Sequence, residues 1–429
     1  MIAQGIFVVV LAASIYLFSR NVGKIARNIH LGRDLDMSNR KGERFRTMMR
    51  VAFGQSKMGT RPVPAFFHLL IYVGFVLINI EVMEILIDGV AGTHRIFQPL
   101  LGGFYTFLLS FFEILGALVL IACVVFLYRR HIQKLFRLNM PEMKGWPAKD
   151  ATNILLIEII LMMALFTMNA ADRSFQLSTE GAMPISSMLA PLFDNIGNHS
   201  LHTIERTAWW FHILGILAFL NYLPFSKHFH IILAFPNTWY TRLEPKGQFA
   251  NMESVTTEVQ LMMDPTAPAP EGYEPPTSFG AKDVQDLSWK NLMDAYTCTE
   301  CGRCTSSCPA NQTGKLLSPR KVMMDTRDRL EEVGKNIDAH SGTFEEDGKN
   351  LHSYISKEEL WACTTCNACA EACPVNINPM EIIFQMRQYL VMEQADAPGE
   401  LNNMFSNMEN NGAPWQFSPS DRANWTQEQ

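Results

Sequence analysis

Five stretches of this chain are predominantly apolar over about 20 residues, the length that an α-helix needs to cross a bilayer. They cover residues 1–18, 62–88, 96–128, 151–170 and 207–226, and the last has an apolar continuation to residue 235. Because backbone groups in lipid must be hydrogen-bonded within the spanning element, each stretch is predicted to be a helix. A basic segment without a cleavage site follows the first stretch, which indicates an uncleaved anchor.

The charges of the connecting loops predict the orientation of these helices. Residues 19–61 hold 11 Lys and Arg against 3 Asp and Glu, and residues 129–150 hold 6 against 2, whereas the other two loops have no basic excess. Basic loops stay on the cytosolic side. We therefore expect a multi-pass protein of the cytoplasmic (inner) membrane with its N-terminus outside and everything after about residue 237 in the cytosol.

Composition agrees with a membrane half joined to a polar half. Charged residues make up 18% of the chain, below the roughly 25% of soluble proteins. The net charge of −6 gives no indication of nucleic-acid binding. Residues 240–429 hold 15 basic against 28 acidic residues, so the cytosolic half is strongly acidic. The predicted organisation is a membrane domain (1–236), a linker (237–280) with a semi-rigid Pro-rich part (264–276), and a cytosolic domain (281–429).

Eight of the nine cysteines form two runs of identical spacing, C-x2-C-x2-C-x3-C-P. This is the bacterial ferredoxin pattern for [4Fe–4S] clusters, in which the fourth cysteine ligates the other cluster. We assign one cluster to Cys298, Cys301, Cys304 and Cys373, and the other to Cys363, Cys366, Cys369 and Cys308. Two zinc sites are the alternative, but zinc sites use paired C-x2-C knuckles rather than four cysteines in one run. The ninth, Cys123, lies in an apolar stretch and is expected to be inert.

The segments around the cysteine runs read as short helices. Ser318-Pro319 starts one that covers residues 322–333, the capping box Ser356–Glu359 starts another that leads to Cys363, and Asn378-Pro379 starts a third that ends near residue 392. No series of strands is predicted. The fold class is therefore all-α, with a five-helix transmembrane bundle followed by a helical two-cluster domain.

Histidines within the apolar stretches are candidate cofactor ligands, because ionisable groups in membrane helices are usually functional. His68 lies near the cytosolic start of the second stretch, His212 lies in the fifth, and His230 lies 18 residues further on. Eighteen residues of helix span about 27 Å and five whole turns, so the two are expected on one face. His68 and His230 both lie at the cytosolic end and can share one b-type haem, with His228 as an alternative inner ligand.

Two family resemblances become specific at this point. The 54 residues between the runs and the tail around Trp415 resemble the C-type iron–sulfur component of heterodisulfide reductase and other helical two-cluster proteins. The His-x17-His spacing, with Pro-Phe-Ser before the second histidine, resembles the respiratory nitrate reductase gamma subunit and related cytochromes b. That resemblance implies a five-helix cytochrome b bundle in which His68 and His230 hold the proximal haem.

This chain departs from the cytochrome pattern at one position. The family has a second histidine ten residues after the first on helix two, and here that residue is Ile78. For a distal haem, His212 would need a histidine of the outer loops, with His94 preferred over His199 and His202; a quinone site or a structural role are the alternatives. Carboxylates that could pass quinone protons are also present. They are Glu81, Glu84, Asp88, Glu113 and Glu158.

No nucleotide-binding motif and no cysteines for a CCG domain are present, so the chain is expected to be an electron-transfer subunit rather than a complete enzyme. It would pass electrons between a membrane quinone, haem b and two [4Fe–4S] clusters, to or from a cytosolic CCG-domain protein or flavoprotein. The acidic cytosolic half suggests a partner with a basic face. The alternative functions are a haem-free, membrane-anchored iron–sulfur scaffold and a redox sensor.

Overall fold

The computed structural model describes the whole chain except residues 180, 181, 246, 250, 265, 271, 274–277, 428 and 429. The predicted linker segment 264–276 therefore lies partly outside the described residues. Among the described residues, five helices are long and apolar enough to cross a membrane, which confirms the predicted number. They are α1 (Ile2–Ile29), α3 (Pro62–Ala91), α5 (Gly103–His131), α6 (Trp146–Ala171) and α9 (Asn198–Tyr222).

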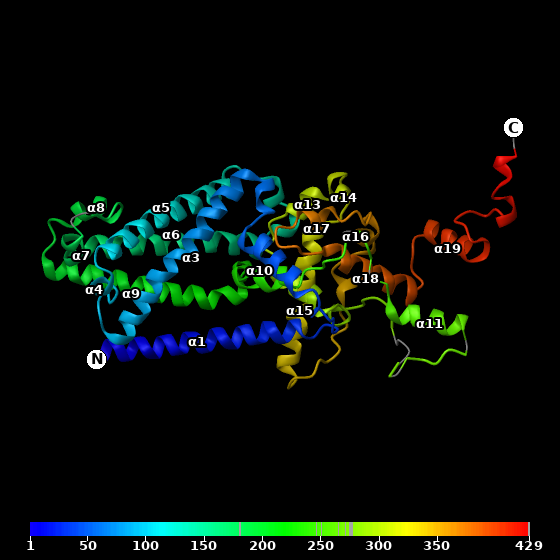
Figure 1. Cartoon of the computed structure of the whole chain (residues 1–429), viewed down its shortest axis with the longest axis horizontal. Coiled ribbons are helices and arrows are strands. Elements are labelled where there is room, and N and C mark those ends of the chain that lie inside the picture. Colours follow the sequence, from blue (N-terminus) through cyan, green and yellow to red (C-terminus); the bar gives the residue numbers. More distant parts are fainter. Residues whose placement is uncertain are drawn as a thin grey trace.

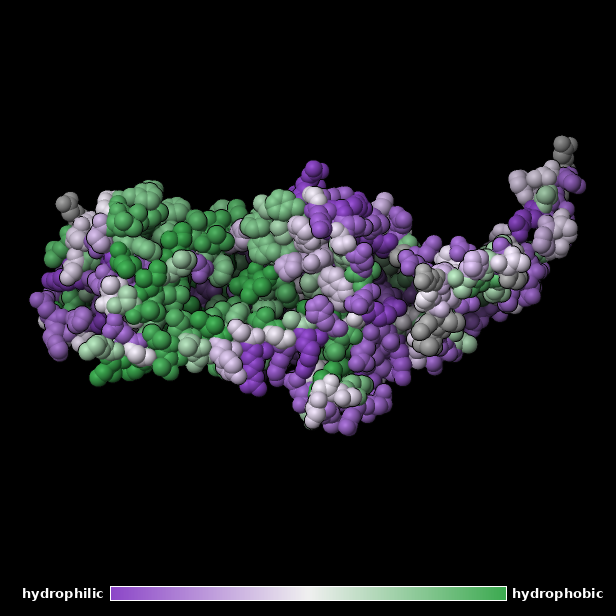
Figure 2. All heavy atoms as spheres, turned by 60° about the horizontal axis from the view of Figure 1, so that its bottom comes forward, coloured by the Kyte–Doolittle hydropathy of each residue, from purple (hydrophilic) through white to green (hydrophobic). Residues whose placement is uncertain are grey.

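These five helices lie side by side along the long axis of the molecule, and the cluster half caps the end away from the N-terminus (Figure 1). Hydrophobic side chains cover the surface of the bundle in a broad band, whereas hydrophilic residues cover its N-terminal end and the cluster half (Figure 2). This distribution is that of a membrane-embedded bundle with polar regions on both sides. Within the described residues the one β-type pairing is an isolated bridge between Arg33 and Ser288, so the predicted all-α class is confirmed.

The helix ends differ from the sequence predictions where glycine or proline intervenes. The third predicted span begins as a separate turn, α4 (Gln98–Leu101), because Gly102 adopts a positive φ of 53° before α5 starts. The expected continuous helix from His212 through His230 is wrong. Pro224 ends α9 at Tyr222, and two short 3₁₀ turns precede α10 (His230–Trp239), because proline removes a helical donor and clashes with the preceding turn.

The first helix is longer than the apolar stretch that predicted it. It continues through a polar segment to Ile29 and reaches the cluster half. Asn28 Nδ2 donates to Tyr296 OH at 2.9 Å, and the backbone N–H of Arg33 donates to Leu287 O at 2.7 Å. A Cβ on Gly32 would lie 2.7 Å from backbone atoms of the cluster half, so only glycine permits this approach. The membrane anchor and the cluster half are therefore packed together directly.

The cluster half is built from short helices around the cysteine loops. The predicted helices are confirmed, including the capping box between Ser356 and Glu359. A linker helix, α11 (Glu253–Met263), lies inside residues 237–280. Further helices are α2 (Lys41–Met48), α7 (Arg173–Ser178), α8 (Ser186–Leu189), α12 (Trp289–Thr297), α13 (Arg303–Ser307), α14 (Pro309–Gln312), α15 (Pro319–Ala339), α16 (Lys357–Ala362), α17 (Ala368–Ala372), α18 (Pro379–Met392) and α19 (Gly399–Asn411).

Candidate metal centres

The two cysteine runs adopt the same backbone conformation. In each run the first cysteine ends a helix, and the third and fifth residues have positive φ angles between 54° and 71°. Left-handed residues at alternating positions turn successive N–H groups toward one side, which forms a concave site for anionic groups. The Thr365 N–H donates to Cys363 Sγ at 3.4 Å. The positions with positive φ are Glu300 and Gly302 in the first run, and Thr365 and Asn367 in the second.

The cysteines gather in the crossed arrangement that the spacing predicts. One small cavity is lined by Cys298, Cys301 and Cys304 of the first run together with Cys373 of the second. Cys308 lies within electrostatic range of Cys363 and Cys369. The two groups adjoin each other, since Cys304 is also within electrostatic range of Cys369. Four thiol donors in each group suit a [4Fe–4S] cluster.

The first group of cysteines, which we call group I, faces the membrane bundle and is held there by buried ion pairs. Glu300, between two of its cysteines, pairs with Lys227 and with Arg327. Burial raises the pKa of Glu300, but the adjacent Lys227 and Arg327 charges outweigh it and hold that pKa below its ordinary value. Arg137 of the loop after α5 donates to Cys301 O at 2.5 Å. Membrane loops thus form one wall of this site.

The second group, group II, lies nearer to the surface. Of its four cysteines, Cys366 is exposed and Cys363 is partly buried, whereas Cys308 and Cys369 are buried. Group II is therefore the cysteine group that has a member exposed to solvent.

A cavity of about 370 Å³ lies between the membrane histidines and group I. His68 and His230 line it, and their ring centroids are 6.4 Å apart. Two imidazoles bonded to one metal at about 2 Å per bond place their centroids at about this separation. His228 also lines the cavity, with its ring 5.6 Å from His230. On the far side, Thr299, Glu300 and Cys301 of the group I loop complete the lining.

The hydrogen bonds of both histidines leave the same ring nitrogen available. His68 Nδ1 lies 3.2 Å from Gln55 Oε1, and His230 Nδ1 lies 3.0 Å from the backbone oxygen of Lys227. Since a carbonyl oxygen only accepts, Nδ1 carries the hydrogen in each ring, and Nε2 is left as the ligand atom. Metal-binding histidines are typically oriented in this way.

A haem pocket also needs positive charge for the two haem propionates, and arginines supply it here. Arg129, Arg130 and Arg137 line the cavity, and Arg130 Nη1 is buried without a hydrogen-bond partner among the described residues. An unpaired buried guanidinium nitrogen is costly unless an anion completes it. Haem carries two propionates, so the cavity fits this cofactor in its imidazole pair and in the guanidinium nitrogen that lacks a hydrogen-bond partner.

The outer histidines are engaged elsewhere. His212 is buried on α9, and its Nδ1 lies 2.9 Å from the backbone oxygen of Leu161. His94 lies in the loop after α3 and contacts Asp172 and Arg206. None of these described contacts joins His94 to His212. Ile78, which stands at the family's histidine position, is buried in an apolar cluster with α5 residues.

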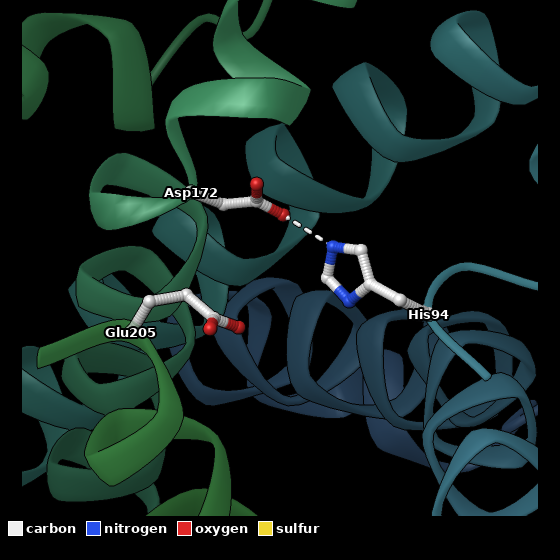
Figure 3. Close-up of side chains that lie close together, drawn as sticks. All are labelled: His94, Asp172 and Glu205. Carbon is white, nitrogen blue, oxygen red and sulfur yellow. Dashed lines mark hydrogen bonds and ion pairs between the residues drawn. The ribbon is translucent and has the colours of Figure 1, made fainter. Parts of the chain in front are cut away.

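Three side chains at the end of the bundle away from the cluster half offer possible metal-ligand atoms within 4.8 Å of one another. They are His94, Asp172 and Glu205, which converge from three segments of the chain (Figure 3). Asp172 Oδ2 already accepts from Arg95 Nε at 3.1 Å, and Arg206 donates to both carboxylate oxygens of Glu205. Because arginines neutralise both carboxylates, this group is an ion-pair network rather than a metal centre.

Sequence reasoning missed the arginines and Gln55. The basic residues of the loops predicted only the orientation of the helices, whereas Arg130 and Arg137 in fact line the cavity. A signal was present, since Arg129, Arg130 and Arg137 all lie in the basic segment 129–150. Nothing in the sequence around Gln55 indicated its role, because that role depends on a contact with His68, which lies 13 residues further along the chain.

Comparison with known proteins supports the iron–sulfur assignment. Residues 297–377 match the family model described as a 4Fe-4S dicluster domain. Over 99% of its length the chain is 30% identical to the probable iron-sulfur-binding oxidoreductase FadF of Bacillus subtilis, of which it covers 60%. Over 88% of its length it is 29% identical to the EtfAB:quinone oxidoreductase of Syntrophomonas wolfei, of which it covers 53%. The chain thus spans a little over half the length of these relatives.

A third relative matches the cluster half alone. Over 24% of the chain it is 32% identical to the C-type component of the ferredoxin/F(420)H(2)-dependent CoB-CoM heterodisulfide reductase of Methanosarcina acetivorans, of which it covers 49%. This confirms the resemblance of the cluster half to the C-type component of heterodisulfide reductase. No solved structure matches the chain. The chain is therefore related to iron–sulfur oxidoreductases and carries a two-cluster [4Fe–4S] region behind five membrane-type helices.

Proposed function

We propose that this chain carries electrons between a cytosolic flavoprotein and quinone in the cytoplasmic membrane, by way of group II, group I and a b-type haem. The observation that carries the proposal is the cavity shared by His68, His230 and the group I loop. A haem in that cavity would supply a one-electron relay, and the chain's residues place it against the first cluster. The order of the centres follows from exposure, since Cys366 is exposed and group I faces the bundle.

The roles of the pocket residues follow from their contacts. His68 and His230 bind the iron through Nε2, with Gln55 and the Lys227 carbonyl fixing the rings. Arg130 binds a propionate through the nitrogen that otherwise has no partner, and Arg129 adds positive charge. We propose one haem rather than two, because position 78 is isoleucine and His94 is engaged by Asp172 and Arg206.

The partner and the quinone are inferred from the relatives. One relative is named for electron transfer between EtfAB and quinone, which favours an electron-transfer flavoprotein over a CCG-domain protein as the partner. The acidic cytosolic half suits a flavoprotein with a basic docking face. The cluster half faces the cytosol in this proposal, as the basic loops require.

The experiment is a reduced-minus-oxidised visible spectrum of the purified full-length protein, with haem quantified per chain as its pyridine adduct. One b-type haem per chain is expected. His68→Ala and His230→Ala should each abolish the haem bands and leave the iron–sulfur content unchanged. A protein without haem that still contains eight iron atoms per chain would contradict the haem assignment and favour the membrane-anchored iron–sulfur scaffold.

A further inference from the structure

A network of buried polar groups occupies the outer half of the bundle, and Arg95 lies at its centre. The guanidinium of Arg95 stacks 3.5 Å from the ring centroid of Phe175. Its Nη2 donates to Asn169 Oδ1 at 3.0 Å, and its Nε donates to Asp172 Oδ2 at 3.1 Å. The Arg95 side chain is almost fully buried. A charge in this position is stable only because the surrounding side chains compensate it.

Buried carboxyl groups outnumber this guanidinium. Glu84 accepts from Tyr105 OH at 2.7 Å and from the Phe97 N–H at 2.9 Å. Glu113 accepts from Asn169 Nδ2 at 3.2 Å and from two backbone N–H groups. Asp88 at the end of α3 accepts from backbone N–H groups of the following loop. The buried carboxyl groups of the network are Glu81, Glu84, Asp88, Glu113 and Asp172.

Glu81 differs from the other carboxyl groups of the network. Its side chain is 4% exposed, and its Oε1 has no hydrogen-bond partner among the described residues. It lies within electrostatic range of Arg95, Glu84 and Glu113. Asn169 lies within hydrogen-bonding range of the carboxyl group, but a buried carboxylate oxygen without a donor still favours the neutral acid over the carboxylate. Several carboxyl groups surround one guanidinium, so some of these groups carry a proton. Glu81 is the carboxyl group whose oxygen Oε1 has no hydrogen-bond donor among the described residues, and it is therefore the one that can carry an exchangeable proton.

The network opens to the outer face at His94. The His94 side chain is 47% exposed, and its Nε2 lies 2.9 Å from Asp172 Oδ2 (Figure 3). That same oxygen accepts from Arg95. A proton that arrives at the outer surface therefore meets an imidazole and then a carboxylate. The Arg95 guanidinium bonds that carboxylate and lies within electrostatic range of Glu81. Arg206, which contacts His94 Nδ1 at 3.3 Å, and Glu205, which forms an ion pair with Arg206, are the other charged groups at this entrance.

From this geometry we propose that Glu81 is a redox-linked proton-exchange site, loaded from the outer aqueous face through His94 and Asp172. The proposal rests on the proposed quinone-linked electron transfer. In quinone reduction, the O–H bond of the Glu81 acid breaks and its proton passes to a quinone oxygen as the quinone accepts an electron that the cytosolic flavoprotein supplies through the clusters. Two such cycles supply the two protons that accompany two electrons. Oxidation of the quinol runs the same steps in reverse.

Arg95 makes the cycle reversible. When Glu81 has lost its proton, its carboxylate faces the guanidinium, which then shares its charge between Glu81 and Asp172. A proton from the outer water, accepted by His94 and passed on through Asp172, restores the Glu81 acid. Glu84 and Glu113 keep their own hydrogen-bond donors throughout, so they hold the position of the network without taking part in the exchange.

The first test is a reduced-minus-oxidised infrared spectrum of the full chain in H2O and in D2O. The wild-type protein should show the carbonyl stretch of a protonated carboxylic acid, shifted in D2O and absent in Glu81→Gln. Glu158→Gln is the matched control, because Glu158 lies on α6 without a described contact to the network, and it should retain the band. Asp172→Asn should slow hydrogen–deuterium exchange of the band at least tenfold. A band that persists in Glu81→Gln would overturn the proposal.

A second measurement separates this proposal from the proposed function. In vesicles, Glu81→Gln should lower quinone reduction at least tenfold, the scale of a lost general acid, while reduction of the clusters by the cytosolic partner stays unchanged. Glu81→Asp keeps a carboxyl group at this position and should restore part of the rate of quinone reduction. A restored rate shows that substitution at position 81 does not prevent folding. Normal quinone reduction in Glu81→Gln would overturn the role of Glu81. A wild-type protein with the infrared band and no quinone reduction would instead refute the quinone as the proton acceptor.

Discussion

The imidazole ring of His68 lies 6.4 Å from that of His230, although 162 residues separate the two in the chain. One ring comes from α3 and the other from the first position of α10, after the break at Pro224. Each ring has its Nδ1 held by an oxygen atom, so both present the same nitrogen to the cavity between them. The two histidines and the group I loop therefore line the same cavity, at the junction of the membrane helices and the cluster half.

The pocket arginine gives the first prediction. Arg130→Met should leave a haem in place but shift its midpoint potential downward, since the propionate charge would lose its compensating cation. The shift is measured by a spectroscopic redox titration. Arg46→Met is the control, because Arg46 lies on α2, exposed and outside the cavity. An unchanged potential in Arg130→Met would show that no haem propionate lies beside this guanidinium.

The crossed cysteine arrangement gives the second prediction. Cys373→Ser should perturb the same cluster signal as Cys298→Ser, although the two residues belong to different runs. Cys308→Ser and Cys363→Ser should together affect the other signal. Electron paramagnetic resonance of the reduced protein distinguishes the two clusters. If Cys373→Ser instead behaved like Cys363→Ser, each run would hold its own cluster, contrary to the arrangement of the loops.

The contact between the first helix and the cluster half gives the third prediction. A Cβ on Gly334 would lie 2.5 Å from the Asn28 side chain, so Gly334→Ala should force α1 and α15 apart. Such overpacking costs about 1–3 kcal/mol. The expected result is a lower thermal unfolding temperature and faster proteolysis between the two halves. Gly23→Ala on α1 is the control, because nothing lies near its Cβ position, and it should be neutral or slightly stabilising.

The fourth prediction concerns the pH dependence of a buried ion pair. Glu142 accepts from the fully buried Arg320, which also donates to the backbone oxygen of Arg137. Burial raises the pKa of Glu142, but hydrogen bonds from Arg320 and Ser318 outweigh it and lower the pKa below its ordinary value. Its contribution to stability is therefore present above about pH 4.3, the pKa of an unfolded glutamate. It is lost as the pH falls through the lowered value.

Glu142→Gln tests this sign. The variant should be less stable than wild type at neutral pH by about 1–3 kcal/mol, because buried donors of Arg320 lose an ionised acceptor. The difference in unfolding temperature should shrink as the pH falls below about 4.3. Glu409→Gln, at an exposed position of α19, should match wild type at every pH. A difference that grew toward acid pH would contradict the assignment of Glu142 as a stabilising carboxylate.

Elements whose signals are local could be predicted from the amino-acid sequence alone. The five apolar stretches gave five helices, because a segment in lipid must satisfy its own backbone. The cysteine spacing gave two matching loops, since the positive φ angles recur at equivalent positions of both runs. The capping box at Ser356 and the helix that starts at Pro379 were also predicted correctly from neighbouring residues.

The tertiary structure decided what depends on contacts between distant segments. Proline at position 224 ended the fifth helix, so the expected alignment of His212 and His230 along one helix does not exist, and His230 reaches His68 from a separate helix. The unpaired Arg130 nitrogen and the free Glu81 oxygen follow from what surrounds them, not from their neighbours in sequence. A local pattern fixes which element forms; the partners that a buried charge finds or lacks are fixed only when all the elements pack.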